Sequence, residues 1–476
     1  MAAEGAEQSA AVAAGAAAPK LYSKSQTGWM LFVLAALLAN SFSDRAILAI
    51  LAQPIMTELR ITDTQFGVLT GLAFATFYAI FGYPIAHLAG RFGRINIITI
   101  CALLWSAMAA GCGMALNYFQ LALFRFGVGI GESGMAAPGQ AIISDYVPPE
   151  RRTSSIALFQ MGPPLGVMAG SVAGGWLAQH FGWRTAFVIV ALPGFLLAPL
   201  LKLTVREPPQ GNWDASRLAG GAPKAAPSLL RVLAKLYSTS TMRHMTAGTV
   251  IAIFANSGAA FLGAYYVRRF GLDYTTLGLI IGIMGGVAGV TGVLMGGFLT
   301  DWFAKWSKRW YALLPTFALL AAAPLFVLAY LQADWRIQSA IMMVSSALLA
   351  IAPIPFYGVT QNLVPGPMRA PAAAIGFFLI NLVSLGFGPV FYGMLIDATS
   401  ANIFAGYQLG DYAALCGPTH TQIAGAEAAR ACKAALAEGT RWSLAGGFVG
   451  FFWAAAHFFL ASRTITAHLA EAQQTN

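Results

Sequence analysis

The chain has 476 residues, of which 58% are hydrophobic and only 10% are charged. Soluble globular proteins carry about 25% charged residues, so this composition excludes an ordinary soluble domain. The net charge of +10 does not indicate nucleic-acid binding, because the basic residues stand in short clusters between long apolar stretches. That distribution is typical of membrane proteins, in which basic residues set the orientation of the spans.

Residues 1–27 begin with an Ala- and Gly-rich stretch, for which we predict a disordered cytoplasmic tail. Uncharged stretches of about twenty residues, long enough to cross a bilayer core, then recur along the chain. They predict an all-α membrane protein with twelve transmembrane helices at 28–51, 66–87, 95–115, 119–142, 154–178, 184–205, 243–268, 275–300, 310–332, 336–362, 371–396 and 442–462.

Most basic residues fall in one set of the segments that connect these spans. The positive-inside rule therefore predicts that both termini face the cytoplasm. The segment 397–441 becomes a long periplasmic loop, and it contains Cys416 and Cys432. Because the periplasm is oxidising, we predict a disulfide between these two cysteines, with an unpaired pair of thiols as the alternative.

An internal repeat divides the chain. The string LAGRF at 88–92 ends the second span, and LTDWF ends the eighth span 211 residues later, at 299–303. Two six-helix halves in parallel orientation are the layout of the major facilitator fold. We predict an N-terminal half at 28–205, a cytoplasmic linker at 206–242, a C-terminal half at 243–463 and a cytoplasmic tail at 464–476.

Four ionisable residues lie well inside the predicted spans: Asp44 and Arg45 in the first, and Arg125 and Glu132 in the fourth. Each costs roughly 2.5–3.5 kcal/mol near the bilayer centre, so intramembrane charges are usually functional. Arg125 and Glu132 are seven residues apart, which places them on one helix face. We expect Asp44 to pair with Arg125, and Glu132 to lie deeper as the less compensated carboxylate.

We interpret these four residues as a proton-coupling site, because two carboxylates with different surroundings can exchange a proton at physiological pH. A static cluster of ion pairs that holds two helices together is the alternative. The second half argues against it. There Ala255 and Asn256 occupy the positions that correspond to Asp44 and Arg45.

Other sequence features carry less information about function. The string GIGESG at 129–134 matches a dinucleotide-binding fingerprint, but it lies within a span and follows no strand, so we interpret its glycines as helix-packing positions. We find no metal-ligand cluster and no nucleophilic triad, and therefore expect neither an enzyme nor a bound cofactor or metal. Polar and aromatic residues of the second half are candidates for substrate binding: Asn256, Phe261, Tyr265, Tyr357, Gln361 and Asn381.

Charged residues of the inner loops are candidates for a cytoplasmic gate that closes when the two halves meet. In the first half these are Arg91, Arg94, Asp145, Glu150, Arg151 and Arg152, and in the second half they are Asp301 and Lys305.

Two segments resemble Spinster-type major facilitator transporters: RFGVGIGESGMAAPGQAIISDYVPPERR at 125–152, and NSFSDRAILAI at 40–50. Arg91, Gly93 and Arg94 also match the facilitator signature, but Gly90 stands where that family usually has an Asp that helps to lock the cytoplasmic side. The resemblance implies a proton-linked exporter of amphipathic molecules such as sphingosine-1-phosphate or lysophospholipids, in the inner membrane of a bacterium. We expect the protein to be a monomer. It assigns the coupling role to Asp44, Arg45, Arg125 and Glu132.

Two other functions stay open at this point. The same fold supports proton-coupled import of organic anions or sugar acids, so the direction and the substrate class are not fixed by the fold. A receptor or scaffold that moves no substrate belongs to a different class, and only a flux measurement separates it from a transporter.

Overall fold

The computed structural model describes residues 20–213 and 229–475, apart from 365–367, 369–371, 373–374, 377 and 418–424. Every regular element in these ranges is a helix. Most of the predicted N-terminal tail, part of the predicted linker and the last residue lie outside the described residues.

The N-terminal half contains the first six spans. The first is α2 (Lys24–Ile50), which is followed by the short α3 (Ala52–Leu59). The second consists of α4 (Asp63–Thr70) and α5 (Leu72–Phe92), and the third is α6 (Arg94–Met114). The fourth is broken into α7 (Tyr118–Glu132) and α8 (Ala136–Tyr146). Helices α9 (Pro149–Phe159) and α10 (Gly162–Thr204) supply the fifth and sixth spans, with a bend at Gly182, where φ is 81°.

The C-terminal half follows α12 (Leu229–Tyr237) and contains more irregular helices. The seventh span is α13 (Ser240–Asn256), the 3₁₀ turn η1 (Ser257–Phe261) and α14 (Leu262–Phe270). The eighth is α15 (Tyr274–Ile283), the π-helical η2 (Met284–Ala288) and α16 (Gly289–Ala304). The remaining helices are α17 (Trp310–Leu331), α18 (Trp335–Ile351), α19 (Pro353–Leu363), the π-helical η4 (Ile380–Phe387), α21 (Gly388–Ala405), α22 (Tyr412–Cys416), α23 (Ala426–Gly447) and α24 (Val449–Thr475).

Within the described ranges, ten helical runs are long and apolar enough to cross a membrane. One of them, Ser155–Thr204, bends at Gly182 and accounts for two spans, and the broken α7–α8 pair accounts for one more. The prediction of twelve transmembrane helices in an all-α fold is therefore confirmed. Large side chains on the outer faces are apolar, such as Phe119 at 80% and Leu203 at 83% exposure, as expected for helices that contact lipid.

The prediction of a long loop at 397–441 is wrong for most of that segment. Helix α21 continues to Ala405, α22 lies beyond it, and α23 already begins at Ala426. The reason is local: residues 426–438 are rich in Ala, Glu, Lys and Arg, all strong helix formers. The last helix, α24, likewise extends to Thr475, through the predicted C-terminal tail. The structure contains the disulfide between Cys416 and Cys432, with a Cα–Cα distance of 5.4 Å.

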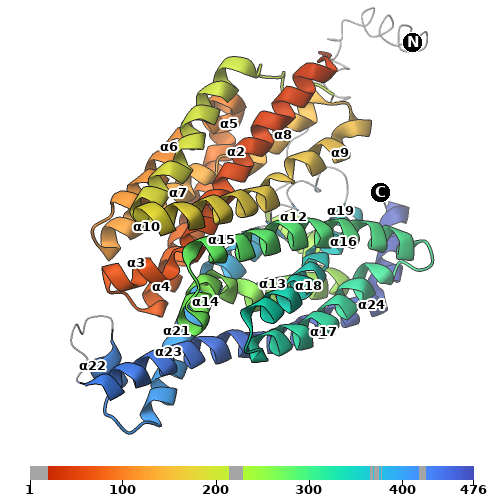
Figure 1. Ribbon diagram of the computed structural model, residues 1–476. Coiled ribbons are helices and arrows are strands. Elements are labelled where there is room, and N and C mark those ends of the chain that lie inside the picture. The colour runs from red at the N-terminus through yellow and green to blue at the C-terminus, as the bar shows by residue number, and fades with distance from the viewer. Residues whose placement is uncertain are drawn as a thin grey trace, which may run out of the picture.

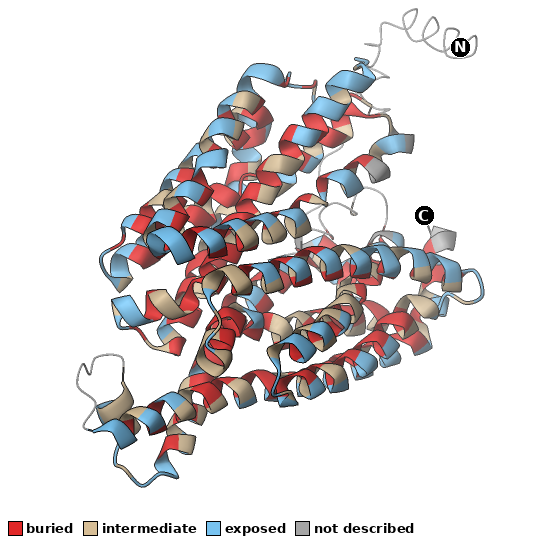
Figure 2. Ribbon diagram, viewed as in Figure 1, coloured by how far each residue is buried: buried red, intermediate tan, exposed pale blue. Residues whose placement is uncertain are grey.

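Figure 1 shows the two halves as two helical bundles. Helix α10 of the first half packs along α15 of the second, and the halves also meet at the end of α3, α4, α14 and α21. We call this the outer end, because the charge pattern predicts that it faces the periplasm, and we call the opposite end the inner end. The start of α2 and the end of α24 lie toward the inner end (Figure 1). Figure 2 shows that buried residues line the interior of each bundle while exposed residues cover its periphery.

Glycines allow α2 and α10 to pack with their backbones in contact. A Cβ at Gly166 would overlap the backbone of Ala39, and one at Gly170 would overlap Ser43. Because this contact fixes α2 against its neighbour, it also fixes the direction in which Asp44 and Arg45 project.

Candidate functional site: a buried charge cluster and an inner polar network

The four intramembrane charges come from two helices whose packing brings them together. Asp44 and Arg45 lie in the outer half of α2, and Arg125 and Glu132 lie on α7. Glu132 is the last residue of α7, and residues 133–135 interrupt the span before α8 begins. Broken helices in membrane proteins are tolerated where the irregular backbone is surrounded by protein, and they commonly mark binding sites.

The prediction for the pairing of these charges is wrong, because Arg45 binds Glu132. Arg45 Nη2 and Nε lie 2.5 and 2.8 Å from Glu132 Oε2, and the Ser41 hydroxyl donates to the same oxygen at 3.2 Å. The Glu132 side chain is fully buried, whereas that of Arg45 is 22% exposed. Ser41 and Arg45 are one helical turn apart, so the same face of α2 presents both side chains to Glu132.

Asp44 is instead the less compensated carboxylate. Both Asp44 and Arg125 are 2% exposed, and no ion pair joins them among the described residues. Asp44 Oδ2 and Arg125 Nε are buried without a hydrogen-bond partner. The physical reason is helix geometry: consecutive residues point about 100° apart, so when α2 directs Arg45 toward Glu132, Asp44 points toward a different part of the cluster.

Aromatic rings surround the two arginines. The Arg45 guanidinium lies 4.4 Å from the ring centre of Phe74 and 4.6 Å from that of Phe42. Arg125 lies 5.4 Å from the same Phe74 ring. Cation–π contacts of this kind stabilise a guanidinium that has lost its water. Sequence reasoning missed Phe74, since one apolar residue in an apolar span gives no signal, and it missed Ser41, although Ser41 precedes Arg45 by one helical turn.

The residues predicted to bind substrate are not brought together in one site. Tyr265 is fully buried and donates to Gln338 Oε1 at 3.0 Å, and Phe261 is fully buried against Phe66. These two residues pack in the interior of this conformation, which corrects their assignment as lining residues. The others are scattered: Asn256 ends α13, Tyr357 is partly buried on α19, Asn381 is buried on η4, and the side chain of Gln361 lies outside the described residues.

An apolar groove lies elsewhere in the second half, between the eighth and tenth spans. It has a volume of about 320 Å³ and is lined by Val287, Ala288, Thr291, Met295, Met343, Val344, Ala347 and Leu348. Methionine side chains are flexible and adapt to apolar ligands of different shape. The sequence offered no reason to single out these residues, because apolar side chains are common in every span.

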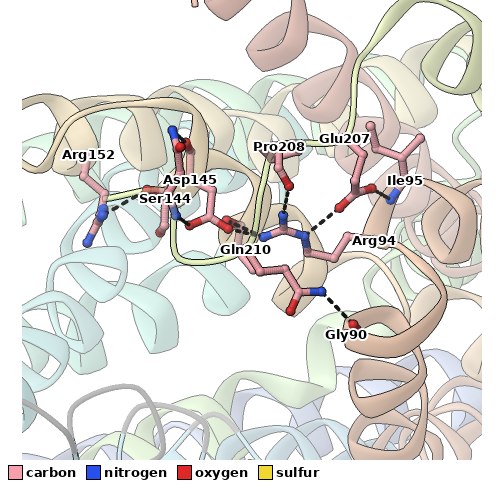
Figure 3. A network of polar contacts seen from close by, with 11 residues as sticks. Gly90, Arg94, Ile95, Ser144, Asp145, Arg152, Glu207, Pro208 and Gln210 are labelled. Carbon is pink, nitrogen blue, oxygen red and sulfur yellow. Dashed lines mark hydrogen bonds and ion pairs between the residues drawn. The ribbon is translucent and has the colours of Figure 1, made fainter. Parts of the chain in front are cut away.

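A second polar network occupies the inner end of the first half, with Arg94 at its centre (Figure 3). Arg94 Nε donates to Glu207 Oε1 at 2.8 Å, Nη2 donates to the Pro208 carbonyl at 2.7 Å, and Nη1 pairs with Asp145. The Arg94 and Asp145 side chains are only 6% and 12% exposed. One buried guanidinium therefore ties α6, α8 and the segment after α10 together.

Residues 206–213 of the predicted linker form a strap across this inner end. Glu207 Oε2 accepts from the Ile95 amide at 2.8 Å, and Gln210 Nε2 donates to the Gly90 carbonyl at 2.6 Å (Figure 3). The Asn212 amide donates to Asp145 at 3.2 Å. Sequence reasoning missed the strap, because a Pro- and Gly-rich stretch after a span is typical of a flexible linker.

The predicted cytoplasmic gate is not assembled between the halves in this structure. Of its first-half members, Arg94 and Asp145 bind each other, Arg152 donates to the Ser144 carbonyl at 2.9 Å, Arg91 and Arg151 are exposed, and the side chain of Glu150 lies outside the described residues. In the second half Asp301 and Lys305 are exposed. Among the described residues they form no ion pair with Arg94, Asp145 or Arg152, which is what we expect of an inward-open state.

The Gly90→Asp variant should shift the protein away from this inward-open arrangement. A side chain at Gly90 would meet no atom within 4 Å of its Cβ, so the carboxylate can project toward the inner gate without strain. One partly exposed ion pair contributes about 0–1 kcal/mol, which changes a balanced population several-fold. Distances between spin labels on the inner loops of the two halves should shorten in Gly90→Asp and stay unchanged in Gly90→Ala. Equal distributions in the two variants would refute this expectation.

Comparison with known proteins agrees with this architecture. The model of the Major Facilitator Superfamily matches residues 33–396. An MFS-type efflux pump of Mycolicibacterium smegmatis is 32% identical over 78% of this chain and 85% of its own, and the hexuronate transporter of Bacillus subtilis is 25% identical over 80% and 90%. A crystal structure of a bacterial homologue of the human lysosomal transporter Spinster, inward-facing and unoccupied, superimposes with a TM-score of 0.82 and 30% identity over 94% of this chain and 99% of that chain.

Proposed function

Because this chain belongs to the Major Facilitator Superfamily and is a membrane transporter rather than an enzyme, we propose that it is a proton-coupled exporter of an amphipathic, lipid-like substrate. The observation that carries the coupling proposal is the buried cluster of Asp44, Arg45, Arg125 and Glu132 at a break in the fourth span. Its two carboxylates differ in their surroundings, and one of them already holds an arginine.

Arg45 gives the cluster two alternative arrangements. With Glu132 ionised, Arg45 binds it, and Asp44 has a buried oxygen without a partner. A proton that reaches Glu132 neutralises this carboxylate and weakens its hold on Arg45, which is then available to the adjacent Asp44. Because α2 and α7 carry the two carboxylates, a proton passing from one to the other changes the attraction between these helices. That change links protonation physically to a movement of the N-terminal half relative to the C-terminal half.

An amphipathic substrate fits the chemistry that the chain offers. A buried cationic site in the first half suits a phosphate or carboxylate head group, and the apolar groove of Val287, Met295 and Met343 suits a hydrocarbon chain. Export is supported by the similarity to an efflux pump, and a lipid-like substrate by the resemblance to Spinster-type transporters. Import of an organic anion is the second candidate, favoured by the similarity to a hexuronate transporter.

A flux assay in proteoliposomes tests both proposals. Purified protein is reconstituted, a pH gradient of either sign is imposed, and movement of sphingosine-1-phosphate, a lysophospholipid and a hexuronate is measured in parallel. We expect gradient-dependent movement of a lysolipid-type substrate that exceeds leakage from protein-free vesicles. Hexuronate flux without lysolipid flux would favour the importer. Flux of all three that ignores the sign of the gradient would exclude proton coupling.

A further inference from the structure

The outer end is where described side chains of one half bind those of the other. Arg268 Nη2 lies 2.9 Å from Asp63 Oδ1, and both side chains are about 5% exposed, at 6% and 5%. Thr64 donates from its amide and its hydroxyl to Asp397 Oδ2, at 3.0 and 2.5 Å. We call Asp63 and Thr64 of the first half, with Arg268 and Asp397 of the second, the outer latch. Because its ion pair is almost buried, breaking it leaves a charge without compensation.

The second-half members of this latch are held by two antiparallel helices, α21 and α23. Thr440 Oγ1 on α23 accepts from Arg268 Nη1 at 2.9 Å, while the preceding Glu438 pairs with Arg269. Between them, Gly439 packs on Ser400 of α21 so closely that a Cβ would lie 2.8 Å from the Ser400 amide nitrogen. Three consecutive residues of α23 therefore fix the position of Arg268 and, through α21, that of Asp397.

A disulfide lies beside the outer ends of these two helices. Cys416 and Cys432 join α22 to α23, and Phe404, Ala431, Cys432 and Ala435 form a small core beside the bond. Phe404 packs on Tyr412 of α22 with 5.6 Å between ring centres. Seven residues separate Phe404 from Asp397 and eight separate Cys432 from Thr440, which is roughly 10–12 Å of helix on each side. We call the described parts of this segment, residues 397–417 and 425–441, the outer hairpin.

The first half has no equivalent of the outer hairpin. Its corresponding connection, between the fifth and sixth spans, is the bend at Gly182 within α10. The transmembrane helices of the two halves thus correspond, whereas the outer hairpin with its cysteines occurs in the second half. It is formed by the same helices, α21 and α23, that hold the latch residues.

We propose that the outer hairpin is a redox-sensitive brace that sets the strength of the outer latch. The disulfide ties α22 to α23, and Phe404 of α21 packs on Tyr412 of α22, so the bond holds the outer ends of α21 and α23 together through α22. It thereby keeps Asp397 and Thr440 in register with Thr64 and Arg268. A dithiol reductant opens the brace: it transfers two electrons and two protons, the S–S bond becomes two thiols, and the reductant becomes a disulfide. The helix ends then loosen, the latch weakens, and the outward-open population rises. This inference rests on the two-half fold and is independent of the proposed substrate and coupling ion.

Spin-label distances across the outer end test the brace. Labels are attached through ketone-bearing residues, so that they do not react with thiols, at Leu116 in the first half and Ala333 in the second, both exposed and outside the latch. The distance distribution is recorded for oxidised protein, for protein treated with a dithiol, and for Cys416→Ser/Cys432→Ser. The Cys101→Ser/Cys112→Ser variant is the control, because these two thiols are free and buried away from the outer hairpin.

We expect reduction and Cys416→Ser/Cys432→Ser to raise the fraction of long distances several-fold. Asp63→Asn should raise it in both redox states, and the control should respond to reductant as the native chain does. If reduction leaves the distances of the native protein unchanged while Asp63→Asn clearly shifts them, the disulfide does not control the outer latch, although the latch itself still closes the outer end. No shift in Asp63→Asn would overturn the latch as well. If Cys416→Ser/Cys432→Ser does not fold, reduction of the native protein alone decides between these outcomes.

Discussion

Replacing Glu132 with glutamine should abolish transport driven by a pH gradient, lowering the initial rate at least tenfold, while the protein still folds. Glutamine has nearly the same size and can still accept from Arg45 and Ser41, so the packing around the fully buried side chain is kept. It cannot take up or release a proton, and the two arrangements of Arg45 are no longer exchanged by protonation. The measurement is uptake or efflux in proteoliposomes under an imposed pH gradient, with monodispersity in detergent as the test of folding.

Glu58→Gln is the matched control for this experiment. Glu58 also pairs with an arginine, Arg184, at 2.9 Å, but its side chain is 50% exposed at the outer end. An exposed pair of this kind contributes little to stability, and its loss should leave coupled transport near the native rate. Asp44→Asn should resemble Glu132→Gln, since both carboxylates belong to the exchange. Native gradient-driven rates in Glu132→Gln would exclude Glu132 from proton coupling and favour a static ion-pair cluster.

The positions of the spans follow from the sequence, because bilayer thickness forces long apolar runs into helices. The repeat of LAGRF and LTDWF is enough to divide them into two halves. The breaks within the spans, in contrast, cannot be predicted from the sequence. Residues 133–135 and the π-helical η2 and η4 lie in stretches as apolar as their neighbours, and only tertiary packing decides which hydrogen-bond pattern they adopt.

For the charge cluster, the sequence predicts which residues belong to it, whereas the packing of the helices decides which of them pair. The rarity of charge in a span identifies Asp44, Arg45, Arg125 and Glu132 as a group. Which of these residues pair depends on how α2 is rotated about its own axis. A rotation by one residue, about 100°, would place Asp44 instead of Arg45 opposite Glu132. The observed rotation is set by the contact of Gly166 and Gly170 with α2, which no local pattern reveals.

The inner network was missed for a different reason. Glu207 is a lone acid before two prolines, and nothing local distinguishes it from a solvated linker residue. Its importance comes from Arg94, a buried guanidinium whose positive charge needs more than one acceptor. The strap of residues 206–213 is therefore part of the N-terminal half in structural terms, although its composition is that of a connecting segment.

The Arg94→Ala variant should be severely destabilised. Its removal leaves the Asp145 carboxylate, only 12% exposed, without a cation, and it frees Glu207 and the Pro208 carbonyl. Removing one partner of a buried ion pair typically costs about 3–5 kcal/mol, because the other charge stays buried and uncompensated. Thermal unfolding in detergent, followed by an intrinsic fluorescence signal, should show a clear fall in the midpoint temperature.

Arg91→Ala is the control in the same signature motif, because Arg91 is exposed and its guanidinium lies 5.5 Å from the ring centre of Phe92. Its loss should change stability by no more than about 0.5 kcal/mol. Arg94→Lys should fall between the two, since an ammonium keeps the charge but cannot reproduce the planar fork that reaches Asp145 and Glu207 together. The sharpest comparison adds Asp145→Asn to Arg94→Met: removing both charges should recover part of the stability that Arg94→Met alone loses. Equal midpoints for Arg94→Ala and Arg91→Ala, or no recovery in the double variant, would mean that the strap is held by contacts other than this buried guanidinium.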